Sequence, residues 1–494
     1  MKTTNTILKI TVFTLFAAFL MSSCNNKEKK EAKKIYNEIG STLDCLAKPS
    51  WFPHTNTTAP LEGDTSVFAN NQKVSNLDFH RWSWQKFLWL TKPKSKTDHT
   101  PLFLNSGDFI QVDAYLTEVM VPNQANLMLT YNEQACSNGI LQTNPNFSDN
   151  KIPYTILYSL HTNTTMLRAA NGFIRGMKEG RIDKELNYET FPIGSLEMKV
   201  SWVLVDALPK ATIKDYYTTY ASVSENNEPA AIKEVALLGM HVVGIVKNHP
   251  EFIWATFEHN SLAPNFNWNK GSASTDTEKL LFSKGSTSTI EGITWVANDT
   301  LKASGKIIPA HVKEKARAYD LFEYGVPRNV GGDFMHTSQS GSENFNNIKN
   351  INTCVQKHLK DVWANYFYNG SIWLDTENYP TLESQAEKLV TLGGNIASAK
   401  PDAITRGSLN CANVTMETFT QTFKSDLKSI NVNNLANCFS CHGASDFATN
   451  NKSPLYISHA FNGLVHLESG QTPNEIEVLK DKEHLKLLLN HANK

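Results

Sequence analysis

The chain has 494 residues, a formal net charge of −1, and 10 Trp, 15 Tyr and 25 Phe. This length allows two or three domains, and the aromatic content allows each to bury a large core. A net charge this close to zero argues against a nucleic-acid partner. No apolar run reaches the length of a mature membrane-spanning helix.

The N-terminus combines two lysines with an apolar run over residues 10–21, a pattern typical of a secretory signal peptide. The run ends in small residues before Cys24, which resembles the lipobox of bacterial lipoproteins. The resemblance implies a lipoprotein signal peptide over 1–23 and lipidation of the Cys24 thiol. An ordinary signal peptide followed by an unrelated cysteine is the alternative. Residues 24–44 are polar and charged, which predicts a lipid anchor followed by a flexible tether.

Residues 45–340 predict a β-rich domain. Residues 195–206 alternate apolar and polar side chains, as a half-buried strand does. Two β-branched runs, 235–246 and 252–259, predict a hairpin. Residues 79–90 place large apolar side chains at helical spacing, which predicts a buried helix.

The predicted hairpin contains candidate catalytic residues. A loop over 247–251 would place His241 opposite Glu258, and His259 follows directly. A carboxylate that bonds an imidazole can orient it for acid–base chemistry or metal binding. A structural polar pair at a sheet edge is the alternative. Two further residues could join this cluster: Glu197 and Lys199, which share one face of their strand.

Composition changes near residue 340, and apolar periodicity then predicts helices over 347–368, 382–392, 413–430 and 475–491. In the third of these helices, Asn413 is expected to be the N-cap.

Residues 438–442 form one complete C-x-x-C-H. Two thiols at this spacing can add to the two vinyl groups of one porphyrin, and the adjacent histidine can bind its iron. A thioredoxin-like dithiol would need a βαβ setting, and a zinc site would need another Cys/His pair at ligand spacing. We therefore predict one covalently bound haem c, attached at Cys438 and Cys441, with His442 as the proximal iron ligand.

The sixth ligand of the iron is less constrained. No methionine follows His442, which excludes the downstream methionine that small class I cytochromes use. His459 lies in an apolar segment 17 residues after His442 and is the favoured distal ligand. A histidine with an ordinary structural role is the alternative. The other candidates are His466, His484, His491 and Met416.

Four cysteines remain once lipid and haem are assigned. An even number of cysteines in an oxidising compartment predicts two disulfides among Cys45, Cys136, Cys354 and Cys411. The preferred pairing joins Cys45 to Cys136 and Cys354 to Cys411, because each loop then stays within one predicted domain. Buried thiols are the alternative.

The fold class expected from these patterns is α+β. A β-rich N-terminal domain over 45–340 would precede a mainly α-helical, cytochrome c-like domain over 341–494.

Several segments also resemble large bacterial proteins of a "cytochrome c family". The resemblance implies that the β-rich part and the haem part are one evolutionary unit, and it brings no known reaction. The similar segments are Trp82–Phe87, Glu197–Lys199 before Trp202, Trp254–His259 and Ala412–Phe419.

The expected function is that of an exported, lipid-anchored monohaem c-type cytochrome in the bacterial cell envelope, facing the periplasm or the cell surface. It would pass electrons between redox partner proteins or small-molecule donors and acceptors, and its lipid would hold it to the membrane. Two alternatives stay open. One is a haem-dependent periplasmic oxidoreductase with its active site between the two domains, and the other is a substrate-binding lipoprotein with a sensory or structural haem.

Overall fold

The computed structural model describes most of the chain from residue 45 to residue 492. The residues outside this description are 1–44, 105, 130–142, 225–228, 264–265, 268–271, 282–283, 288–294, 297–307, 310–340, 394–403, 409–412, 417–437 and 493–494. The signal peptide, Cys24, the tether, Cys136, Cys411 and most of the helix predicted over 413–430 therefore lie outside the described residues. So do the side chains of His484 and His491.

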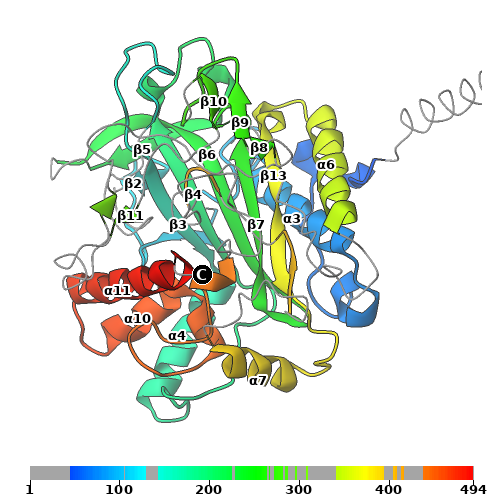
Figure 1. Ribbon diagram of the computed structural model, residues 1–494, viewed down its shortest axis with the longest axis vertical. Helices are drawn as coiled ribbons and strands as arrows, with labels where there is room; N and C mark the ends of the chain where they lie inside the picture. Colours follow the sequence, from blue (N-terminus) through cyan, green and yellow to red (C-terminus); the bar gives the residue numbers. More distant parts are fainter. Residues whose placement is uncertain are drawn as a thin grey trace, which may run out of the picture. The chain divides into compact units, whose positions relative to one another are not determined.

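A nine-stranded, largely antiparallel sheet forms the centre of the described fold (Figure 1). Seven strands follow one another in space: β1 (Phe109–Val112), β3 (Leu157–Asn163), β4 (Leu196–Leu204), β6 (Ala231–Val246), β7 (His249–His259), β13 (Tyr366–Leu374) and β14 (Thr405–Gly407). The strand β5 (Thr218–Val223) pairs antiparallel with β6, and β2 (Leu127–Leu129) pairs parallel with β5. Smaller pairings join β8 (Phe266–Asn267), β9 (Ser272–Thr275) and β10 (Gly285–Thr287), and separately β11 (Trp295–Val296) and β12 (Ile308–Pro309).

The helices lie in two groups around this sheet (Figure 1). Alongside β13, α3 (Asn76–Thr91) packs against α6 (Gly341–His358). The lower part of the view holds α4 (Thr164–Lys178), α7 (Leu382–Leu392), α10 (His459–Glu468) and α11 (Pro473–Ala492). The short helix α9 (Cys438–Cys441) packs against α11. None of the described helices is both long and apolar enough to cross a membrane.

The expected fold class is wrong, because the C-terminal part is not mainly helical. Residues Ala47–Lys494 form one compact unit, and β13 lies between β7 and β14 in the main sheet. The helix predicted over 347–368 ends at His358. The aromatic and β-branched run that follows forms β13 instead, because such side chains suit a buried, pleated surface.

The hairpin is present, but its register differs from the prediction. Its turn contains only Lys247 and Asn248, and Asn248 has a φ of 64°. A short polar residue such as asparagine tolerates this left-handed conformation. Because β7 begins at His249, His241 lies opposite Thr256, and Glu258 lies opposite Gly239. His241 and Glu258 are therefore not directly paired across the strands.

Several local predictions are confirmed. The strand β4 lies within the predicted range 195–206, and its Met198, Val200 and Trp202 are buried as the alternation requires. The helix α7 matches the prediction over 382–392, and α3 and α11 include the helices predicted over 79–90 and 475–491. For β4 and α7, the local periodicity was sufficient.

Candidate functional site

The C-x-x-C-H motif forms the short helix α9 and the residue that follows it. The His442 backbone N–H donates to the Cys438 carbonyl at 2.9 Å, which continues the helical turn. Cys438 and Cys441 lie outside any disulfide and are half-buried. Phe439 between them is fully buried and fixes the helix to the apolar core. One anchored turn thus presents two thiols and an imidazole.

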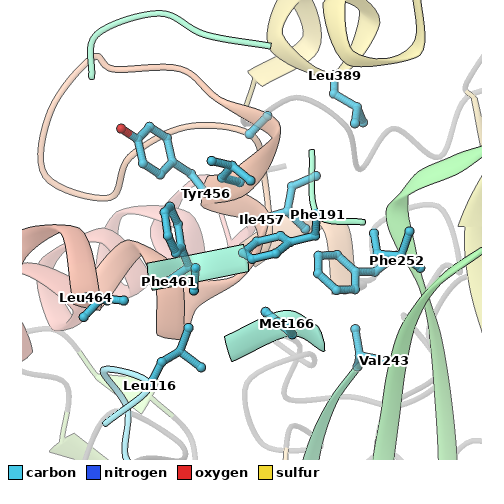
Figure 2. Close-up of a cluster of buried hydrophobic side chains, with 14 of the residues drawn as sticks. Leu116, Met166, Phe191, Val243, Phe252, Leu389, Tyr456, Ile457, Phe461 and Leu464 are labelled. Carbon is cyan, nitrogen blue, oxygen red and sulfur yellow. The ribbon is translucent and has the colours of Figure 1, made fainter. Parts of the chain in front are cut away.

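The core that holds Phe439 is shared by the sheet and the C-terminal segment (Figure 2). Burial of a large apolar side chain in such a cluster stabilises the fold by roughly 1.5–3 kcal/mol, so the C-x-x-C-H motif is firmly attached to the sheet. The labelled members include Val243 of β6, Phe252 of β7, Met166 of α4 and Leu389 of α7, with Tyr456, Ile457, Phe461 and Leu464 from the 3-10 turn η11 (Pro454–Ile457) and from α10.

The imidazole of His442 is oriented by a backbone group. Its Nδ1 donates to the Ile457 carbonyl at 2.9 Å, which places a proton on Nδ1. Histidines that bind metals commonly use one ring N–H in this way, because the bond fixes both tautomer and ring orientation. His442 therefore fits the role of the proximal haem ligand.

Two other rings pack against His442. The ring centre of Trp254, on β7, lies 4.2 Å from that of His442. His459 stacks on His442 at 3.9 Å between ring centres, with 25° between the ring planes. The Nε2 of His459 also donates to the Cys441 carbonyl at 2.9 Å. We call Trp254, His442 and His459 the His442 ring cluster.

Glu197 of β4 is bonded to Ser458, the N-cap of α10, and Ser458 directly precedes His459 of the His442 ring cluster. The Ser458 hydroxyl accepts from the Phe461 N–H at 3.1 Å and donates to Glu197 Oε1 at 2.6 Å. Burial raises the pKa of the Glu197 carboxyl to about 7, although the Ser458 bond and the charge of Lys199 both act to lower it. Nothing in the local sequence pattern relates Glu197 or Trp254 to the haem motif, because their contacts with it join distant parts of the chain.

The three hairpin candidates for catalysis have other surroundings. The His241 Nδ1 bonds the Thr256 hydroxyl at 2.8 Å. Glu258 accepts from the Asn369 side chain at 2.6 Å and from the Val414 N–H at 2.8 Å. These bonds give Glu258 a structural role within the sheet.

His259 is also structural. Its ring stacks on Tyr216, with 3.8 Å between ring centres, and both of its nitrogens have hydrogen-bond partners in Ser261 and the Asp215 carbonyl. Burial lowers the pKa of His259 to about 4, so the ring is neutral at pH 7.

Two of the other candidates for the sixth ligand are engaged elsewhere. The His466 Nε2 bonds Asp446 at 2.9 Å, and its Nδ1 bonds Gln471. Met416 is fully buried, in a separate apolar cluster with Tyr158 and Val414. These contacts give both side chains structural roles.

The donor set fits a haem better than a single zinc ion. A structural zinc ion takes four ligands that surround one point, and the motif itself supplies three, Cys438, Cys441 and His442. Thiols that bond to two separate vinyl groups of a porphyrin do not need to converge in this way.

Of the remaining cysteines, Cys45 and Cys354 are disulfide-bonded. The sequence led us to prefer a different pairing. That preference rested on the assumption of two separate domains. Their expected partners, Cys136 and Cys411, lie outside the described residues.

The chain matches no family model, no curated protein and no solved structure.

Proposed function

We propose that the chain is an exported, lipid-anchored c-type cytochrome with one covalently bound haem, and that it transfers electrons between a donor and an acceptor. The observation that carries the proposal is the arrangement at α9. Cys438 and Cys441 lie on one anchored turn, and His442 has its Nδ1 proton held by the Ile457 carbonyl. Export and lipidation rest on the sequence of residues 1–24.

In this proposal each residue of the motif has one task. Cys438 and Cys441 form thioether bonds that hold the porphyrin, and the His442 Nε2 binds its iron. When bound, the haem supplies one-electron chemistry. The Ile457 carbonyl keeps the His442 proton on Nδ1, and Phe439 keeps the motif attached to the sheet through the shared core.

The first experiment tests covalent attachment. The protein is produced in a bacterial host that matures c-type cytochromes, and its intact mass and pyridine haemochrome spectrum are measured. We expect the mass to rise by one haem and the spectrum to be that of a c-type haem. The C438S/C441S variant should lose both signals, whereas Asn450→Ala, at an exposed position in the following loop, should keep them. A wild-type protein of unmodified mass contradicts the proposal.

A second candidate function is a haem-dependent oxidoreductase. The engagement of His466 with Asp446 and Gln471 favours it, because this histidine is then not available as a sixth ligand. An accessible sixth coordination position on the haem iron would admit a small exogenous ligand. Addition of CO to the reduced holoprotein separates the two functions: rapid spectral change favours the oxidoreductase, and no change favours electron transfer alone.

A further inference from the structure

We infer that His459 is a positioning residue on the proximal side of the haem, and that it sets the orientation of the His442 imidazole together with Trp254. The inference rests on the proposed function, because it presupposes a haem bound through His442. It assigns to His459 a role different from the distal ligand that the sequence suggested.

The first argument is the stacking of the two imidazoles. A metal binds a ring nitrogen of histidine in the plane of the ring, along the direction of the lone pair. A second ring on the face of that imidazole therefore lies on the same side of the porphyrin as the imidazole itself. His459 lies in this way, at 3.9 Å and 25° from His442. A sixth ligand would have to lie beyond the iron, on the opposite side.

The second argument is the hydrogen bond of His459. Its Nε2 donates to the Cys441 carbonyl at 2.9 Å, so Nε2 carries the proton in this arrangement. Binding of iron through Nε2 would require this bond to break. Because Cys441 directly precedes His442, the same bond also holds the backbone from which the proximal imidazole projects.

The third argument is that the sheet supports both rings that contact His442. Trp254 is a buried residue of β7. His459 begins α10, whose N-cap Ser458 is bonded to Glu197 of β4 at 2.6 Å. Two strands of one sheet, β7 and β4, thus restrict the rotation of the His442 ring. This support is a specific contribution of the large β-rich part of the chain to the haem.

The test uses electron paramagnetic resonance and absorption spectra of the oxidised holoprotein with His459→Phe and His459→Ala. Phenylalanine keeps a stacking ring but can neither bind iron nor donate a hydrogen bond. We expect the spin state of the wild type to be retained in both variants. We also expect the g-values to spread in the alanine variant, because the His442 ring loses a restraint. Conversion of a low-spin wild type to high spin in both variants would overturn the inference and identify His459 as the sixth ligand.

Two further variants keep the test decisive. His466→Gln changes another histidine of α10 that has no ring contact with His442, and it should leave the g-values unchanged. Trp254→Leu should broaden them without a change of spin state, which tests the ring cluster even where a His459 variant does not fold. Unchanged g-values in both His459→Ala and Trp254→Leu would also overturn the inference. A wild type without covalent haem refutes the proposed function itself, and the pyridine haemochrome assay reports that outcome separately.

Discussion

Glu197 is an acidic side chain whose protonation is coupled to folding. Burial raises its pKa from 4.5 to about 7 in the folded state. Between these two values the folded protein holds a proton that the unfolded chain has released. The contribution of Glu197 to the free energy of unfolding must therefore fall as the pH rises from about 4.5 to about 7. Above that range this contribution should change little.

The substitution Glu197→Gln tests this coupling. Glutamine can still accept the bond from Ser458 but carries no charge, so the variant should lack this loss of stability. Relative to wild type, we expect the variant to gain about 2–3 kcal/mol between pH 5 and pH 8. Urea denaturation at both pH values measures the difference. A constant difference between the two proteins across this range would show that Glu197 is ionised normally.

The pair of Asp446 and His466 has the opposite character, because both members are stabilised in their charged forms. Burial opposes the charge on each residue. The hydrogen bond and charge of the partner outweigh this effect, so the pKa of His466 is raised and that of Asp446 is lowered. The contribution of Asp446 is lost as the pH falls below its usual range, and that of His466 is lost as the pH rises through its raised pKa. The pair therefore stabilises the fold most in mildly acidic solution.

Asp446→Asn should remove this charge pairing and destabilise the protein by about 1.5–3 kcal/mol near pH 6. The loss should shrink toward pH 9, because the contribution of the His466 charge is lost as the pH rises through its raised pKa. Chemical denaturation at the two pH values gives the comparison, with the exposed loop variant Asn450→Ala as the control. A loss that is equal at pH 6 and pH 9 would argue against a charged histidine.

At the scale of elements, segments that lie far apart in the sequence meet at β7. The Val414 N–H donates to Glu258 at 2.8 Å, and the Asn413 side chain donates to the Phe257 carbonyl at 3.1 Å. On the helical side, Trp84 packs against Phe257 with 5.1 Å between ring centres. The strand β7 thus contacts residues that lie far from it in the sequence on both sides.

Gly239 leaves room for the Asn413 side chain, which bonds the Phe257 carbonyl of β7. A Cβ atom at this position would lie 2.5 Å from Nδ2 of Asn413. Gly239→Ala should therefore destabilise the protein by about 1–3 kcal/mol, because the buried amide would have to move. The loss should be smaller when Asn413→Ala is present, and thermal or urea unfolding of the single and double variants measures this coupling.

Gly172→Ala is the matched control for this substitution. Gly172 lies within α4, and a Cβ there would meet nothing within 4 Å. Alanine should stabilise the helix by about 0.5–1 kcal/mol, because glycine is a poor helix former. A similar loss of stability in both variants would mean that the contact with Asn413 is not the cause.

The elements that could be predicted from the sequence are those with a strong local pattern. The helix α7 and the alternating strand β4 are examples, because their buried faces repeat at the helical and strand periods. The helix start expected at Asn413 is described only as far as residue 416, so the prediction over 413–430 stays a prediction. Residues 414–416 form a turn in which the Asn413 carboxamide accepts from the Thr415 N–H at 3.0 Å. Asparagine bonds its own backbone in turns as readily as at helix starts.

The candidate site could be predicted only in part. The C-x-x-C-H motif is a local signal, so its three residues could be read directly from the chain. The contacts of His442 with Trp254 and of Ser458 with Glu197 depend on the order of strands in the sheet. That order comes from pairings between distant segments, which local periodicity does not encode. The placement of β13 was missed for the same reason.

At the scale of the whole molecule, the position of β13 makes the part that carries the C-x-x-C-H motif dependent on the rest. Tyr366 pairs with His259 of β7, and on its other side β13 pairs Ile372 with Gly407 of β14. A strand with partners on both sides cannot lose one of them without exposing a row of unpaired backbone groups. The helix α6 would likewise lose its packing against α3.

We therefore predict that residues 341–494 do not fold as an isolated fragment. The fragment keeps the haem motif but lacks β7, Trp254 and the members of the shared core on β6 and α4. Its circular dichroism should show no cooperative thermal transition, and limited proteolysis should degrade it rapidly. A fragment of residues 45–494 is the control and should unfold cooperatively. A stable, cooperatively unfolding 341–494 fragment would instead mean that the C-terminal part is an independent cytochrome domain, with β13 only docked on the sheet. The comparison is decisive. A single sheet that includes β13 requires the 341–494 fragment to remain unfolded, whereas a chain of two independent domains requires it to unfold cooperatively.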